Sequence, residues 1–200
     1  MEVPWSSLIG LLFMTMGPIQ AVAVFANVGT DDRGPGVRPM AARATALTAT
    51  AFVLAVFGGT GTLAGWGVSL PVLIGSGGIV ILALSLQSLL APSRPMPPPI
   101  DPLTTRATQI VFPGLFPPIA VTIPIIFAAA LPDMRTRLQI IAVGLVLILI
   151  NWILMLFAKK IIRAIGTVPL EILGAVFGVL QVALGLQFIV NAVMMLIKQG

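Results

Sequence analysis

The residues that carry most metal, redox and acid–base chemistry are missing from this chain of 200 residues. It contains no Cys and no His, and only 8% of its residues are charged. The absence of Cys excludes disulfides and thiolate metal sites, and the absence of His removes the commonest metal ligand and general base. We therefore expect no metal and no cofactor. We also expect no enzymatic activity, because a serine nucleophile would find no His to activate it.

Apolar residues, by contrast, are abundant. They make up 58% of the sequence, which leaves too little polar surface to cover a soluble globule. The composition predicts an integral membrane protein in contact with lipid. The net charge of +5 comes from Lys and Arg residues that flank the apolar runs and do not gather with aromatic side chains. We therefore expect no nucleic-acid partner.

Six apolar runs are close to the roughly 20 residues that a helix needs to cross a bilayer. They cover residues 5–27, 44–66, 69–90, 107–131, 138–158 and 170–197. Most Lys and Arg residues follow the first, third and fifth runs. Because positively charged loops stay on the cytoplasmic side, this distribution places both termini on the opposite side. The sequence thus predicts an all-α polytopic protein with six transmembrane helices.

The chain also contains an internal repeat with a spacing of 100 residues. Residues 78–87 recur as residues 178–187, with the Gly, the Ala, two Leu and the Gln in the same positions. We therefore divide the chain into a first three-span repeat at 1–91, a Pro-rich cytoplasmic linker at 92–106 and a second three-span repeat at 107–200. Since each half contains an odd number of spans, the second repeat is expected to be inverted relative to the first.

The first and fourth runs contain prolines at matching positions. Gly17-Pro18 lies in the middle of residues 5–27, and Pro118 follows Pro18 by 100 residues in a run with three further prolines. Proline lacks a backbone donor and clashes with the preceding turn, so both helices should kink or break. One interpretation is a packing kink; the other, favoured by the matching positions, is a pair of discontinuous helices that face a substrate. The candidate substrate-binding residues are Gly17, Pro18, Gln20, Pro117, Pro118 and Thr122.

Small and amide residues recur in the remaining runs. In the sixth run Gly174, Gly178 and Gly185 form a stripe of small residues at helical spacing, with Gln181 between them, a pattern that lets helices approach closely. Asn151 is expected to form an interhelical hydrogen bond, because an unpaired amide in hydrocarbon costs roughly 2–7 kcal/mol. The residues assigned to helix packing or polar contacts are Gly78, Gln87, Asn151, Gly178, Gln187 and Asn191.

Three short segments complete the pattern: Val68-Ser69-Leu70-Pro71, Gly77-Gly78-Ile79 and Leu186-Gln187-Phe188-Ile189-Val190-Asn191. Together with the proline breaks they resemble the MarC family of bacterial inner-membrane proteins, and the resemblance extends over nearly the whole chain. It implies a bacterial inner membrane with both termini periplasmic, and a function similar to that of relatives classed as neutral amino acid transporters. The chain departs from the family pattern in several places, including the absence of an acidic residue late in the third span, where it has Ser85 or Gln87. Gly17-Pro18-Ile19-Gln20 stands where the family has Asp-Pro-x-Gly, and Val121-Thr122-Ile123 where it has Gly-Pro-Gly.

Two functions fit these features. The first is a carrier for small neutral, amino-acid-like solutes, in which broken-helix ends hold a zwitterion. No charged residue lies in the middle of a predicted span, so the sequence offers no obvious side chain for proton coupling. The alternative is a transport-inactive accessory or structural subunit of a larger membrane protein complex. A homo-oligomer without other proteins would favour the carrier, whereas a larger membrane complex would favour the accessory subunit.

Overall fold

The computed structural model describes residues 5–16, 37–90, 118–131, 133–166 and 168–199, together with residues 18, 21, 22 and 25. Within these ranges the ordered elements are all helices and there is no strand. The helices are α1 (Trp5–Met16), α3 (Val37–Gly65), α4 (Leu70–Leu90), α6 (Pro118–Ala130), α7 (Met134–Ile165) and α8 (Val168–Gln199).

Two lengths of helix occur. Four helices, α3, α4, α7 and α8, are long and apolar enough to cross a membrane. By contrast, α1 has 12 residues and α6 has 13, which at 1.5 Å per residue is only about 18–20 Å. The predicted first and fourth spans continue into residues 17–27 and 107–117, which lie largely outside the described residues. Four of the six predicted spans therefore correspond to long apolar helices, and the number of six spans stays a prediction.

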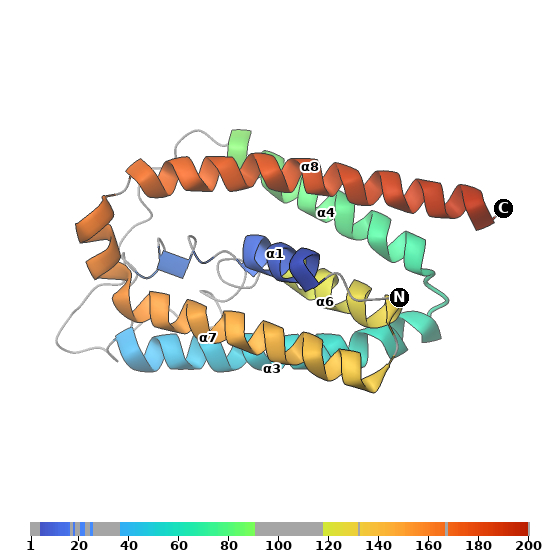
Figure 1. Cartoon of the computed structure of the whole chain (residues 1–200), viewed down its shortest axis with the longest axis horizontal. Helices are drawn as coiled ribbons and strands as arrows, with labels where there is room; N and C mark the ends of the chain where they lie inside the picture. Colours follow the sequence, from blue (N-terminus) through green and yellow to red (C-terminus); the bar gives the residue numbers. More distant parts are fainter. Residues whose placement is uncertain are drawn as a thin grey trace.

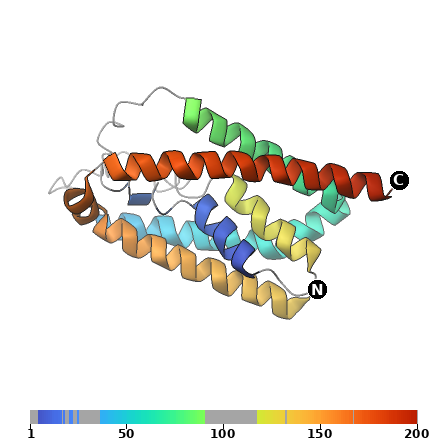
Figure 2. The ribbon, with the colours of Figure 1, turned by 45° about the horizontal axis from the view of Figure 1, so that its top comes forward.

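The long helices form two antiparallel pairs, and the short helices lie between them. Helix α4 packs along α8, and α3 packs along α7 (Figure 1). Helices α1 and α6 occupy the space between the two pairs, and α6 contacts α3, α4, α1 and α7 (Figure 2). The two short helices are thus the central elements of the described fold.

The start of α3 differs from the sequence prediction. The second predicted span begins at residue 44, but the helix begins at Val37 and includes Arg38 and Pro39. Proline is tolerated in the first turn of a helix, because the backbone N–H groups there have no partner inside the helix. The predicted boundary was wrong because it treated a polar, Pro-containing segment as loop.

Helix α7 is also longer than the predicted 138–158. It begins after Asp133, whose carboxylate accepts a hydrogen bond from the backbone N–H of Thr136 at 3.2 Å, an arrangement typical of a helix N-cap. It ends at Gly166, whose φ of 84° is the left-handed conformation common after a helix and whose N–H donates to the carbonyl of Ile162 at 2.8 Å. The hydropathy pattern predicted the apolar centre of this helix but not its charged ends.

The largest buried cluster lies where α1, α3 and α7 meet. Leu8 and Leu12 of α1, Phe52 of α3 and Ile140 of α7 are fully buried in it. The ring of Phe52 covers Gly144 of α7 so closely that a Cβ there would collide with it. This packing fixes the position of α1 against the α3–α7 pair.

Helices α4 and α8 cross at two glycines. A Cβ on Gly78 would lie 2.7 Å from the carbonyl oxygen of Gly185, and a Cβ on Gly185 would lie 2.9 Å from the backbone nitrogen of Leu82. Because these neighbours are backbone atoms, no side chain can move to make room. Gly174 is different, since nothing lies within 4 Å of its position. Its predicted place in the packing stripe is therefore wrong.

Candidate functional site at the end of α1

Helix α1 ends at Met16, directly before Gly17-Pro18. Proline has no backbone N–H, so it cannot bond the carbonyl four residues earlier, which is that of Met14. The side chain of Gln181 replaces the missing donor: its Nε2 donates to the Met14 oxygen at 2.7 Å. A helix on the other side of the molecule, α8, therefore completes the last turn of α1.

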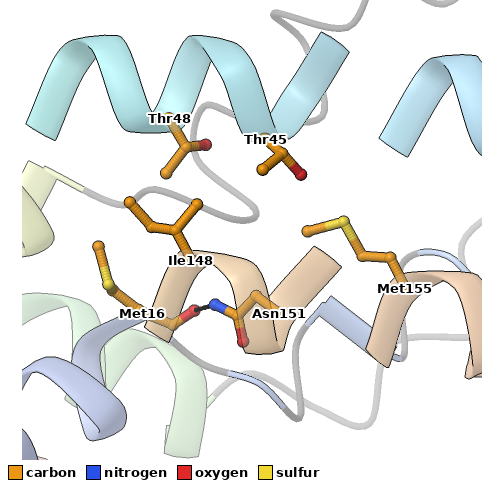
Figure 3. A pocket seen from close by; sticks show the side chains of 6 residues that line it. All are labelled: Met16, Thr45, Thr48, Ile148, Asn151 and Met155. Carbon is orange, nitrogen blue, oxygen red and sulfur yellow. Dashed lines mark hydrogen bonds between the residues drawn. The ribbon is translucent and has the colours of Figure 1, made fainter. Parts of the chain in front are cut away.

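A second amide reaches the same helix end from α7. The Nδ2 atom of Asn151 donates to the carbonyl oxygen of Met16 at 3.2 Å (Figure 3). Both residues are buried, with 7% of Asn151 and 1% of Met16 exposed. Because buried amides and carbonyls are costly unless paired, this bond stabilises both partners.

The network continues from Gln181 to α4. The hydroxyl of Ser85 donates to Oε1 of Gln181 at 3.3 Å, and Ser85 is only 3% exposed. Gln181 thus accepts a bond from α4 and donates one to α1 while belonging to α8. Rotating this amide by half a turn would set its oxygen against the Met14 carbonyl, so the two bonds fix its orientation.

A small cavity lies beside the Asn151–Met16 bond. It is lined by Met16, Thr45, Thr48, Ile148, Asn151 and Met155 (Figure 3). Its volume of about 10 Å³ is close to the minimum that one water molecule needs. In this conformation the cavity has no room for an amino acid.

The two threonines present hydroxyl oxygens as acceptors. Thr45 donates to the Ala41 carbonyl at 2.8 Å and Thr48 donates to the Ala44 carbonyl at 2.9 Å. Since each hydroxyl has one proton and two lone pairs, the oxygens can still accept hydrogen bonds. A bound water could therefore donate to either hydroxyl.

The site is built from neutral groups. Its amides, hydroxyls and carbonyls belong to residues without ionisable side chains. Among the described residues, no group of three His, Cys, Asp or Glu is placed to hold a metal ion. The carboxyl end of α1 carries the partial negative charge of the helix dipole, so it favours hydrogen-bond donors and cationic groups nearby.

The predicted substrate-binding residues are only partly described. Gly17, Gln20 and Pro117 lie outside the described residues, whereas Pro18 is buried beyond the end of α1. Pro118 is the first residue of α6. Thr122 follows one turn later in α6 and lies against Gly77 of α4. A Cβ added to Gly77 would lie 2.8 Å from the methyl carbon of Thr122. Their role in binding stays a prediction.

The predicted packing and polar residues fall into two groups. Gly78 and Asn151 lie at interhelical contacts as described above, and Gly178 lies against Leu89 of α4. Gln87 is exposed on α4. On α8, exposed Gln187 donates to Asn191 at 2.8 Å. This bond lies within one helix and does not join α8 to another helix.

Thr45 and Thr48 were not selected from the sequence, and Gln181 was named only as part of the packing stripe of the sixth run. A signal for Gln181 was present in the sequence, since a single amide in an apolar run needs a partner and Pro18 leaves the Met14 carbonyl without one. No signal in the sequence distinguished Thr48 from the other threonines of α3, because its burial depends on how α3 packs against α7.

The comparisons with known proteins agree with this architecture. A family model described as MarC family integral membrane protein matches residues 2–197. No curated protein and no solved structure matches the chain. The family match includes both short helices and all four of the long apolar ones. This chain therefore belongs to the MarC family and is a multi-pass integral membrane protein.

Proposed function

We propose that this protein is a non-enzymatic membrane carrier for small neutral solutes of amino-acid-like chemistry. The observation that carries the proposal is the end of α1. It stops in the interior of the molecule, where amides from α7 and α8 hold its last carbonyls. Short helices that end inside a membrane protein are where transporters commonly build their substrate sites.

The chemistry of the site supports a neutral substrate. Its groups are uncharged, so a solute with a net charge would lose its hydration without an opposite charge in return. A zwitterion is better suited, because its ammonium group can face the negative end of the α1 dipole. Its carboxylate would then need donors, and the amides of Asn151 and Gln181 are the nearest described ones.

We also propose that the two halves are inverted repeats. Helices α3 and α7, like α4 and α8, occupy sequence positions about 100 residues apart and run antiparallel (Figure 1). Two contacts between α4 and α8 are reciprocal under that offset: Gly78 lies against Ile189, and Gly178 lies against Leu89. Reciprocal contacts of this kind are expected when a two-fold axis in the membrane plane relates the halves.

The distribution of charge supports a bacterial inner-membrane location with periplasmic termini. Arg38 and Arg43 lie near the start of α3, and Lys159, Lys160 and Arg163 lie near the end of α7. Because α3 and α7 are antiparallel, these five residues are at the same end of the molecule (Figure 1). Lys and Arg favour the cytoplasmic side.

Counterflow in liposomes tests the transport proposal. Purified protein is reconstituted, the vesicles are loaded with one unlabelled neutral amino acid, and uptake of the labelled form is followed. We expect saturable uptake that depends on the internal amino acid. Gln181→Leu should lower this uptake, whereas the exposed Thr50→Val should leave it unchanged. Absence of counterflow across a panel of neutral amino acids and related small solutes would contradict the proposal.

One observation favours the second candidate, a transport-inactive accessory subunit. The carbonyls at the end of α1 already have amide partners, and the adjoining cavity holds about one water. Native mass spectrometry of protein extracted from its own membrane distinguishes the candidates. Other proteins present in fixed stoichiometry, combined with no counterflow, would support the accessory role.

A further inference from the structure

Helix α8 makes its contacts with the rest of the described chain on one side. Gly178, Gly185 and Ala192 face α4, and Gln181 reaches α1. It is the least buried of the four long helices. In each long helix we compare the buried share of an 18-residue apolar stretch. This share is 11% in α8 and 33% to 39% in the other three helices. The other side of α8 is therefore open to whatever surrounds the protein.

One amide, Gln187, lies on that open side, and a second, Asn191, lies half-buried at its edge. Gln187 comes two residues after Gly185, which places it about 200° around the helix from the α4 contact. It is exposed, and its Nε2 donates to Oδ1 of Asn191 at 2.8 Å. Ala183, Gln187 and Asn191 are spaced by four residues, so they share one face of the helix.

The depth of Gln187 makes this exposure costly. The candidate span covers Val168–Lys198, and Gln187 is four residues from its middle, about 6 Å along the axis. The hydrocarbon is about 30 Å thick, so Gln187 lies within it. After the bond between the two side chains, the oxygen of Gln187 and the amide nitrogen of Asn191 can still form hydrogen bonds, and lipid chains offer no partner.

We propose that this face of α8 is the interface with a second copy of this chain. Each amide has both donors and acceptors, so two copies related by a two-fold axis can pair Gln187 with Gln187 or Asn191 across the interface. Ala183 lets the two helices approach closely at the same face. The exposed apolar side chains of Val176 and Met194 extend the contact along the helix.

Cysteine cross-linking tests this interface, because the natural chain has no Cys and provides a clean background. Gln187→Cys and Leu186→Cys are compared in native membranes under mild oxidation. Leu186 is 50% exposed and at nearly the same depth, but about 100° away around the helix. We expect a disulfide-linked dimer of this chain with Gln187→Cys and little with Leu186→Cys.

Other outcomes of this experiment would overturn the proposal. Equal cross-linking of both variants would indicate random collision. Labelling of Gln187→Cys by a membrane-impermeant maleimide, without dimer formation, would indicate a water-lined path. Neither dimer nor label would indicate contact with lipid, and a cross-link to a different protein would indicate another partner.

A second measurement does not depend on cysteine. Gln187→Leu should weaken dimerisation in mild detergent about tenfold, the effect of losing one or two interhelical hydrogen bonds. Gln87→Leu on α4 is the matched control, since Gln87 is exposed and lies at the equivalent repeat position. Dimer fractions that are the same for Gln187→Leu and the natural chain would contradict the proposed interface.

Discussion

At the scale of single residues, the end of α1 depends on hydrogen bonds that the helix cannot supply itself. Pro18 removes the donor for Met14, and Gln181 replaces it at 2.7 Å. Asn151 of α7 donates a hydrogen bond to the Met16 carbonyl at the same helix end. Amides from two other helices thus stabilise a buried helix end, which water does not reach.

Replacing Gln181 by Leu should destabilise the protein. The change leaves the Met14 carbonyl without its donor and Ser85 without its acceptor, and an unpaired buried polar group costs about 1–3 kcal/mol. Thermal unfolding in detergent, followed by Trp fluorescence, should show a lower midpoint. Gln87→Leu, which alters an exposed amide of α4, is the control and should not lower it. An equal loss in both variants would show that Gln181 has no special role.

Replacing Thr48 by Val tests the small cavity. Val keeps the shape of Thr, so the change mainly removes a hydroxyl from a residue that lines the cavity together with Asn151. We expect a loss of about 1 kcal/mol in the free energy of unfolding. Thr50→Val on the same helix removes an exposed hydroxyl that bonds the Ala46 carbonyl in the same way and should have little effect. Similar unfolding midpoints for the two variants would argue against a polar role for the cavity.

At the scale of helices, the close crossing of α4 and α8 sets their geometry. Gly78 and Gly185 place backbone against backbone, and this approach brings Ser85 within reach of Gln181. The crossing therefore positions one of the two amides that hold α1. A larger residue at either glycine would separate the helices and displace the network.

Gly185→Ala should accordingly be destabilising. The added carbon would lie 2.9 Å from the carbonyl oxygen of Gly78 and from the nitrogen of Leu82, and overpacking of this kind costs about 1–3 kcal/mol. Gly174→Ala, on the same helix, meets nothing within 4 Å and should be tolerated. Unfolding midpoints in detergent compare the two. A midpoint for Gly185→Ala as high as that for Gly174→Ala would mean that the helices can separate without loss.

At the scale of the whole molecule, two antiparallel helix pairs enclose two short helices. This arrangement places the start of α3 and the end of α7 at one end of the molecule (Figure 1). The basic residues at those helix ends are therefore at one end of the molecule, and this clustering supports the proposed orientation.

Labelling of single cysteines at the two ends of α7 tests that orientation. Met134 is 59% exposed and Ile165 is 54% exposed, and neither substitution changes a charge. We expect a membrane-impermeant maleimide to label Met134→Cys in cells with a permeable outer membrane. Ile165→Cys should react only after the inner membrane is opened. The reverse pattern would place the basic end outside and contradict the proposed orientation.

The sequence by itself determined the helical membrane class and the family resemblance. These features are local: apolar runs form helices in lipid, and Pro18 removes a backbone donor wherever the chain folds. The helix ends were harder to place, because Pro39, Asp133 and Lys159 belong to helices whose apolar centres are several residues away.

Only the tertiary structure decided which groups meet at the candidate site. Asn151 and Met16 are 135 residues apart in the chain, and Gln181 and Met14 are 167 apart. The sequence predicted that a buried amide in hydrocarbon needs a partner, but several carbonyls and hydroxyls could have served. The packing of α7 and α8 against α1 determined which carbonyls the amides of Asn151 and Gln181 bond. A hydrogen bond forms only where helix geometry brings donor and acceptor within about 3 Å.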